Sequence, residues 1–175
     1  MTERQEIIDL GGLRAVAVGD PDAARVVMTL AHGLQMEPGD LSPFAHSLGV
    51  PAWFLFPEAP LDAEPRGRAW WSVDTAARAQ AIAQGPRDFV AQHPSGLATA
   101  RARLLAFLEA AKAAAGTRPL VIGGFSQGGM LTCDVLLRSE LTVAALVLLS
   151  ASRIAFDEWQ PLTPASDVCA LPYLQ

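Results

Sequence analysis

A short apolar strand, a serine flanked by glycines and a helix follow one another in the second half of the chain, and this unit restricts the fold most. Residues 120–123, Leu-Val-Ile-Gly, have the length and composition of a buried strand, and residues 127–139 those of a helix. Residues 124–128 connect them with Gly-Phe-Ser-Gln-Gly, the pattern Gly-x-Ser-x-Gly. Glycines two positions from Ser126 let the backbone pack closely, so a sharp turn can lift the hydroxyl above the end of a sheet.

The alternative is a glycine-rich turn that contains an incidental serine. At average composition the bare pattern occurs by chance in roughly one in ten chains of this length. The strand before the motif and the helix after it favour the functional interpretation, because that context defines a nucleophile elbow. A serine at a helix N-terminus also lies where the helix dipole and free N–H groups stabilise developing negative charge. We therefore interpret Ser126 as a catalytic nucleophile.

The rest of the chain alternates between short apolar runs and helical patterns. Strands are expected at residues 6–10, 13–18, 25–30, 51–56, 120–124 and 144–149, and helices at residues 41–48, 97–115 and 127–139. Gly11-Gly12 predicts a hairpin turn between the first two strands, Asp40 a helix N-cap and Gly49 a helix end. Such alternation predicts an α/β fold with a mainly parallel sheet and helices on both faces.

Composition limits the class of protein. A chain of 175 residues, 51% hydrophobic and 18% charged, suits a single globular domain, here residues 1–175. The net charge of -5 and the lack of a basic patch argue against nucleic acid as a partner. The polar N-terminus has no signal-peptide pattern, and no apolar run is long enough for stable insertion into a membrane. Two cysteines far apart, Cys133 and Cys169, do not predict a disulfide framework, so a cytoplasmic location is expected.

Two segments need a separate interpretation. Residues 57–96 are rich in Pro, Gly, Ala and charge, and we expect a long, partly helical excursion of the kind that often carries function. Residues 168–174 have the pattern of one more strand, after which a parallel sheet needs a further loop and helix. The expectation is an incomplete domain that lacks its last strands and helices.

A second candidate element follows the expected strand at residues 25–30. Residues 31–35, Ala-His-Gly-Leu-Gln, begin the loop that leaves this strand. Alone, they fit an ordinary strand end with a buried histidine. Together with the elbow, they predict an oxyanion hole in which the backbone N–H groups of Leu34 and Gln127 bind the developing oxyanion.

These motifs resemble those of the phospholipase/carboxylesterase family, which includes acyl-protein thioesterases and lysophospholipases. Residues 120–130 resemble that family's elbow, residues 31–34 its first oxyanion loop, and residues 69–72, Ala-Trp-Trp-Ser, its aromatic segment near the acyl site. The resemblance extends over essentially the whole chain. It implies an α/β-hydrolase fold with little or no cap, and hydrolysis of esters or thioesters without a metal or cofactor.

The same resemblance implies site residues and one departure. Besides Ser126, it points to substrate-binding roles for Trp70, Trp71, Gln35 and Met130. Adjacent tryptophans also fit a plainer arrangement, in which one belongs to the core and the other to a rim. Gln35 stands where the family commonly has glycine, which affects the width of the oxyanion loop.

A serine needs a base, and the expected base is not obvious in the chain. In this family the triad follows the order Ser, Asp, His, and both partners would lie beyond Gln175. The chain's histidines are His32 in the oxyanion loop, His46 in the first helix and His93 in the long excursion. His93 can serve only if its loop folds over Ser126. Asp134, two helical turns after Ser126, is the nearest carboxylate in the sequence.

Two functions follow from these observations. The first is a serine carboxylesterase that hydrolyses carboxylic esters or thioesters of short-to-medium acyl chains through an acyl-serine intermediate. The alternative is a non-catalytic or degenerate hydrolase-like binding module that lacks the Asp and His. Either would take a small-molecule ester or thioester, and the sequence leaves the oligomeric state open, with a homodimer as one option.

Overall fold

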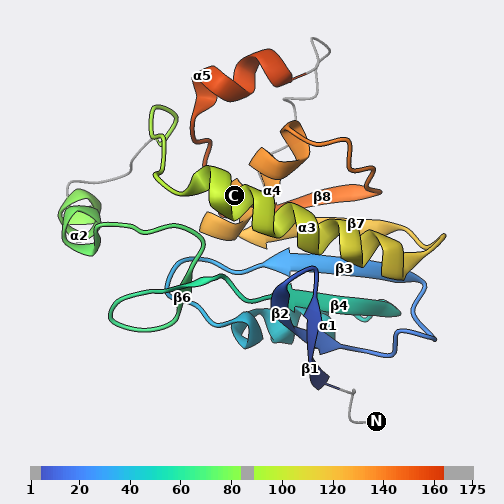
Figure 1. The fold of residues 1–175 in the computed structure, drawn as a ribbon. Helices are drawn as coiled ribbons and strands as arrows, with labels where there is room; N and C mark the ends of the chain where they lie inside the picture. The colour runs from blue at the N-terminus through green and yellow to red at the C-terminus, as the bar shows by residue number, and fades with distance from the viewer. Residues whose placement is uncertain (1–4, 84–88, 164–175) are drawn as a thin grey trace.

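The structure, a computed structural model, describes residues 5–83 and 89–163. Its centre is a six-stranded sheet of order β1-β2-β4-β3-β7-β8 (Figure 1). The strands are β1 (Gln5–Leu10), β2 (Leu13–Val18), β3 (Val26–Ala31), β4 (Ala52–Pro57), β7 (Leu120–Phe125) and β8 (Ala145–Leu149). β1, β2 and β4 pair antiparallel, whereas β4, β3, β7 and β8 pair parallel. The prediction of a mainly parallel sheet is therefore confirmed.

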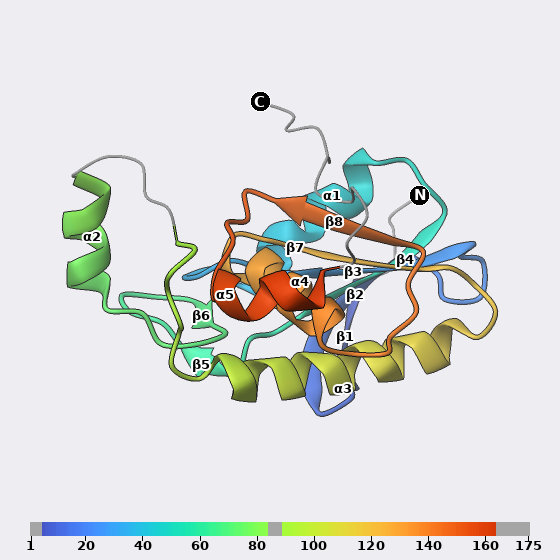
Figure 2. The same cartoon turned by 90° about the horizontal axis from the view of Figure 1, so that it is seen from above.

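Helices cover both faces of this sheet (Figures 1 and 2). α3 (Leu97–Ala115) and α4 (Gln127–Leu137) pack on one face, and the short η1 (Pro38–Leu41) and α1 (Ser42–Ser47) pack on the other. α5 (Phe156–Trp159) and η2 (Gln160–Leu162) follow β8. Between β4 and α3 come a small hairpin of β5 (Leu61–Asp62) and β6 (Arg68–Ala69), and then α2 (Thr75–Ala83). α2 stands off the body beyond the end toward which β3 runs.

The larger hydrophobic core lies between the sheet and the α3–α4 layer. Leu104 and Leu108 of α3 are fully buried there, as the helical spacing of these leucines predicts, and Leu105 packs against them partly buried. Cys133 of α4 is also partly buried, and burial raises the pKa of its thiol to about 11. The thiol is therefore protonated and unreactive at neutral pH.

The expected elements form close to their predicted bounds, with three differences. The helix expected at residues 41–48 is divided into η1 and α1, and Asp40 is not its N-cap. The Asp40 carboxylate instead accepts the N–H of Glu37 at 2.9 Å, within the 3₁₀ turn, and α1 begins without a side-chain cap. α4 ends two residues earlier than expected, at Leu137. The strand expected at residues 168–174 and Cys169 lie outside the described residues.

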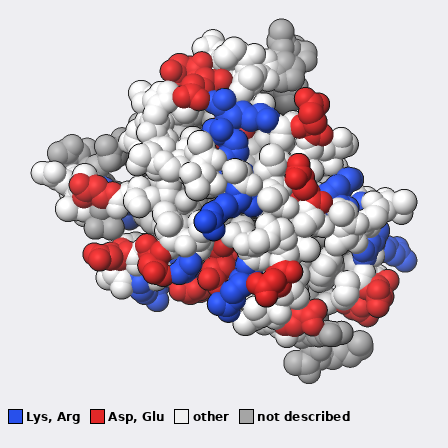
Figure 3. Space-filling model, in the orientation of Figure 1, with Lys and Arg blue, Asp and Glu red and all other residues white. Residues whose placement is uncertain are grey.

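The surface charge and the character of the helices both bear on which partners the protein can have. The face in Figure 3 carries acidic and basic side chains interspersed, without an extended patch of one sign. In the part of the chain that the structure describes, no helix has the length and apolar character needed to cross a membrane.

Candidate active site

Ser126 occupies the sharp turn between β7 and α4. Its backbone has φ 50° and ψ -115°, a left-handed conformation that costs free energy for a residue with a side chain. Hydrogen bonds on both sides hold it: the Ser126 N–H donates to Leu149 O at 2.8 Å, and Met130 N–H donates to Ser126 O at 3.0 Å. The strain is thus maintained by β8 on one side and by the first turn of α4 on the other.

Close backbone packing explains both glycines of the motif. A Cβ atom on Gly124 would lie 2.5 Å from the carbonyl carbon of Gly128. A Cβ atom on Gly128 would lie 2.2 Å from Ala31 O, at the end of β3. Since these neighbours are backbone atoms that cannot turn aside, neither position accepts a side chain. The elbow therefore packs directly against the end of the central strand.

Leu34 and Gln127, the residues whose backbone N–H groups the sequence named as donors, line the same cavity as Ser126. Gln127 is the first residue of α4, where a helix N–H has no acceptor four residues earlier within the helix. The Leu34 N–H has no hydrogen-bond acceptor among residues 5–83 and 89–163. Two such groups beside a serine are suited to bind a carbonyl oxygen as it gains negative charge.

The buried Gln127 side chain has a separate structural role. Its Oε1 accepts the Trp70 N–H at 2.9 Å, and its Nε2 donates to Trp71 O at 3.0 Å. These bonds join the first turn of α4 to the tryptophan pair, and the side chain is only 4% exposed. The sequence motif did not reveal this role, because the partners are more than fifty residues apart.

His32 supports the oxyanion loop from within the core. Its Nε2 accepts the Ala59 N–H at 3.1 Å, so the ring proton resides on Nδ1, which donates to Gly33 O at 2.8 Å. Burial lowers the pKa of the imidazole, which favours the neutral form further. Trp70 Nε1 donates to His32 O at 2.9 Å. Both ring nitrogens are therefore engaged by backbone groups, one in the loop and one just after β4, and His32 is not the base for Ser126.

Gln35 ties the oxyanion loop to the β5–β6 hairpin. It adopts φ 64°, its N–H donates to Arg68 O at 2.9 Å, and its side chain donates to Glu64 O. A Cβ atom on Gly67 would lie 2.5 Å from the Gln35 backbone, so the two segments are in close contact. Gln35 does not line the cavity. Gln35 thus holds the loop in this structure, and its contact with substrate stays a prediction.

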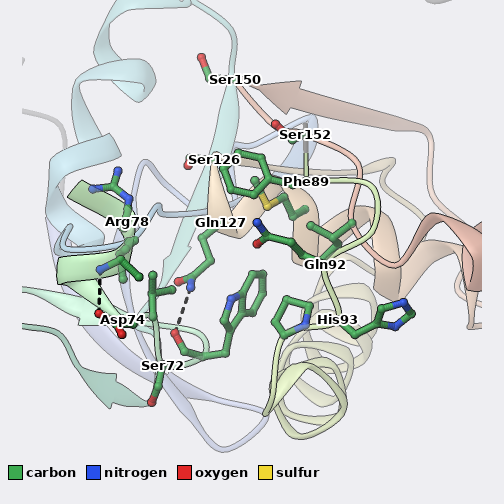
Figure 4. A pocket seen from close by; sticks show the side chains of 17 residues that line it. Ser72, Asp74, Arg78, Phe89, Gln92, His93, Ser126, Gln127, Ser150 and Ser152 are labelled. Carbon is green, nitrogen blue, oxygen red and sulfur yellow. Dashed lines mark hydrogen bonds between the residues drawn. The ribbon is translucent and has the colours of Figure 1, made fainter. Parts of the chain in front are cut away.

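The cavity beside Ser126 has a volume of about 580 Å³ (Figure 4). Its walls come from residues 71–78, 89–94 and 150–154, together with Leu34, Ser126, Gln127 and Met130. Trp71 and Met130 line it, as the resemblance implied. Trp70 does not, because its side chain is 1% exposed and packs beside His32 with ring centroids 5.7 Å apart. Both tryptophans are buried in the larger core, and Trp71 alone also lines the cavity.

His93 lies at the cavity but is committed to two carboxylates. Its Nε2 is 3.1 Å from Asp157 Oδ1, and its Nδ1 is 3.1 Å from Glu158 Oε1. Figure 4 shows the ring turned away from Ser126. The Ser126 hydroxyl forms no hydrogen bond with any residue in the described ranges, so no residue there is positioned as its base in this structure.

Asp134 does not approach Ser126 but joins three helices. Its side chain is fully buried and accepts hydrogen bonds from Trp159 Nε1 at 2.8 Å, Arg138 Nε at 3.1 Å and Arg101 Nε at 2.5 Å. The Asp134–Arg138 spacing of four residues was the one local signal for this cluster. Within the described ranges, no group of three or more His, Cys, Asp or Glu side chains gathers as metal ligands would.

No protein-family model matches the chain, and no curated protein matches its sequence. Solved structures do match. A carboxylesterase from Mesorhizobium loti has 20% identity and a TM-score of 0.65, over 86% of this chain and 66% of that one. Esterase PE8 has 22% identity and a TM-score of 0.62, over 92% and 69%. A phospholipase/carboxylesterase from Dyadobacter fermentans has 17% identity and a TM-score of 0.55, over 88% and 63%.

The chain spans about two thirds of the length of these proteins. At such identities the likeness concerns the fold, which agrees with the observed strand order, the helices on both faces and the serine turn between β7 and α4. This chain has the α/β-hydrolase fold.

Proposed function

We propose that this protein is a serine carboxylesterase that hydrolyses carboxylic esters or thioesters of short-to-medium acyl chains. The observation that carries the proposal is Ser126 in its strained turn, at a cavity that Leu34 and Gln127 also line. A serine with positive φ costs free energy, and such strained residues cluster at functional sites. In a nucleophile elbow this conformation exposes the hydroxyl beside the backbone N–H groups of the oxyanion hole. The structural neighbours include a carboxylesterase and an esterase, which supports the same reaction class.

The proposed reaction has two halves. Ser126 Oγ attacks the carbonyl carbon while a base takes the hydroxyl proton, and the Leu34 and Gln127 N–H groups bind the resulting oxyanion. Collapse of this intermediate breaks the C–O or C–S bond, and the alcohol or thiol leaves with the proton. Water then attacks the acyl-serine by the same steps, which releases the carboxylic acid and restores Ser126.

The base and its carboxylate partner are proposed to follow Gln175 in the complete protein. His32 is used inside the core, and both nitrogens of His93 face carboxylates. A chain order of Ser, Asp and His places both partners after the nucleophile. The length of the matched esterases, of which this chain spans 66% in one case, is in keeping with such a position.

The test is hydrolysis of p-nitrophenyl butyrate by the protein at its full natural length, with Ser126→Ala and Ser47→Ala. Ser47 is a control because it lies at the exposed end of α1 and bonds Pro43 O. The Ser126 variant should lose about 10³-fold or more in kcat, and the Ser47 variant should keep its activity. A fluorophosphonate should add one adduct to the wild type, located at Ser126 by peptide mass. Equal activity of the Ser126 variant would refute the proposal.

A further inference from the structure

The titratable side chains that line the cavity are Asp74, Arg78 and His93, and two of them are already engaged. The Asp74 carboxylate accepts the Ala77 N–H at 2.9 Å, as a cap on the first turn of α2. His93 is held between Asp157 and Glu158. The Arg78 guanidinium, in contrast, forms no ion pair or hydrogen bond with any residue of the described ranges. It is the charged group of this lining that remains available to a ligand.

Arg78 lacks a partner although one is close in sequence. Asp74 precedes it by four residues, a spacing at which an acid and a base pair on a helix surface. The use of Asp74 as a helix cap takes its carboxylate away from that pairing. Some other arginines do pair with carboxylates, for example Arg68 with Asp62 and Arg138 with Asp134. Figure 4 shows the Arg78 side chain extending from its helix at the edge of the cavity.

An unpaired guanidinium has a definite ligand preference. It presents five N–H donors in a planar fork, which matches two oxygens of one carboxylate or phosphate group. Val73, Ala77 and Phe89 line the same cavity and offer apolar surface for the carbon chain that would carry such a group. The lining thus combines a reactive serine, an apolar wall and one available cation.

We propose that Arg78 binds an anionic oxygen group of the substrate, so that preferred substrates are esters or thioesters that carry a carboxylate or phosphate away from the scissile bond. The inference rests on the proposed role of Ser126 and adds the substrate class. Asp74, in the same lining, opposes such a ligand by charge. An asparagine there would keep the cap and remove the opposition, because both residues are good N-caps.

The experiment compares three p-nitrophenyl esters of similar length: the hemiadipate, its methyl-capped neutral counterpart, and a 6-phosphonooxyhexanoate. Arg78→Gln should lower kcat/KM for an anionic ester about three- to tenfold through KM, and leave the neutral ester within about twofold. Arg78→Lys should keep part of the preference, and Asp74→Asn should increase it. Arg103→Gln, an exposed arginine of α3, is the matched control. Comparison of kcat/KM for the hemiadipate and the 6-phosphonooxyhexanoate shows whether Arg78 prefers a carboxylate or a phosphate.

If neither the wild type nor any variant hydrolyses the neutral ester, the result counts against catalysis by Ser126 and not against the role of Arg78. Binding is therefore measured as well, with monomethyl adipate and the Ser126→Ala protein by calorimetry. Adding Arg78→Gln should weaken this affinity about three- to tenfold, whether or not the protein turns over an ester. Unchanged affinity, or an equal loss for the anionic and neutral esters, would overturn the role of Arg78.

Discussion

Gly128 shows how one missing side chain sets the position of the nucleophile. Its α-carbon faces Ala31 O and His32 O so closely that an added Cβ would come within 2.5 Å of both. We expect Gly128→Ala to cost about 1–3 kcal/mol in the free energy of unfolding and to abolish labelling of Ser126 by a fluorophosphonate. Gly39→Ala is the matched control, since a Cβ there meets no atom within 4 Å. Equal stability of the two variants in urea would contradict this.

His32 makes a second residue-scale prediction, in the pH dependence of stability. Burial lowers the pKa of the folded imidazole below its ordinary 6.5, so the unfolded chain binds the proton first as pH falls. Stability is then lost below pH 6.5, at up to about 1.4 kcal/mol per pH unit. In His32→Gln, whose amide oxygen can still accept the Ala59 N–H, this loss should be absent. Urea unfolding from pH 7.5 to 5.0 measures the difference, and parallel curves would refute it.

At the scale of elements, Asp134 joins α3, α4 and α5 through one buried carboxylate. Asp134→Asn would leave the partly buried Arg101 and Arg138 without their shared anion, which we expect to destabilise the protein by about 2–3 kcal/mol. Glu109→Gln, on the exposed face of α3, should stay within about 0.5 kcal/mol. The free energy of unfolding in urea measures both. Similar values would show that the three helices do not depend on this contact.

Local pattern was sufficient for most elements and for the serine turn, because strand composition, helical spacing and flanking glycines are properties of neighbouring residues. The failures involve distant partners. Trp70 and Trp71 are identical neighbours in the sequence, and only Trp71 lines the cavity; their backbone is bonded to Gln127, more than fifty residues away, which no local pattern reveals. The prediction of Asp40 as a helix N-cap was wrong for a local reason. A 3₁₀ turn precedes α1, and within it the Asp40 carboxylate accepts the Glu37 N–H.

For the whole molecule, the cavity predicts how activity varies with acyl length. A volume of about 580 Å³ with Trp71 and Met130 in its wall should accept methylene groups at about 0.8 kcal/mol each, or roughly fourfold in kcat/KM per carbon. We expect the rate with p-nitrophenyl esters to rise from acetate through medium chains and then to level off or fall. Trp71→Ala should flatten the rise. A rate independent of chain length would place the acyl group outside this cavity.

The sheet carries the nucleophile, whereas segments outside the sheet form much of the cavity wall, and this has a consequence for engineering. Residues 71–78 and 89–94 supply much of the cavity surface, yet none of them belongs to the six-stranded sheet. The elbow and the oxyanion loop, in contrast, are built on the ends of β7 and β3. Substitutions confined to residues 72–78 and 89–94 would therefore change the cavity wall while leaving the strand ends that carry Ser126 and the oxyanion loop unaltered.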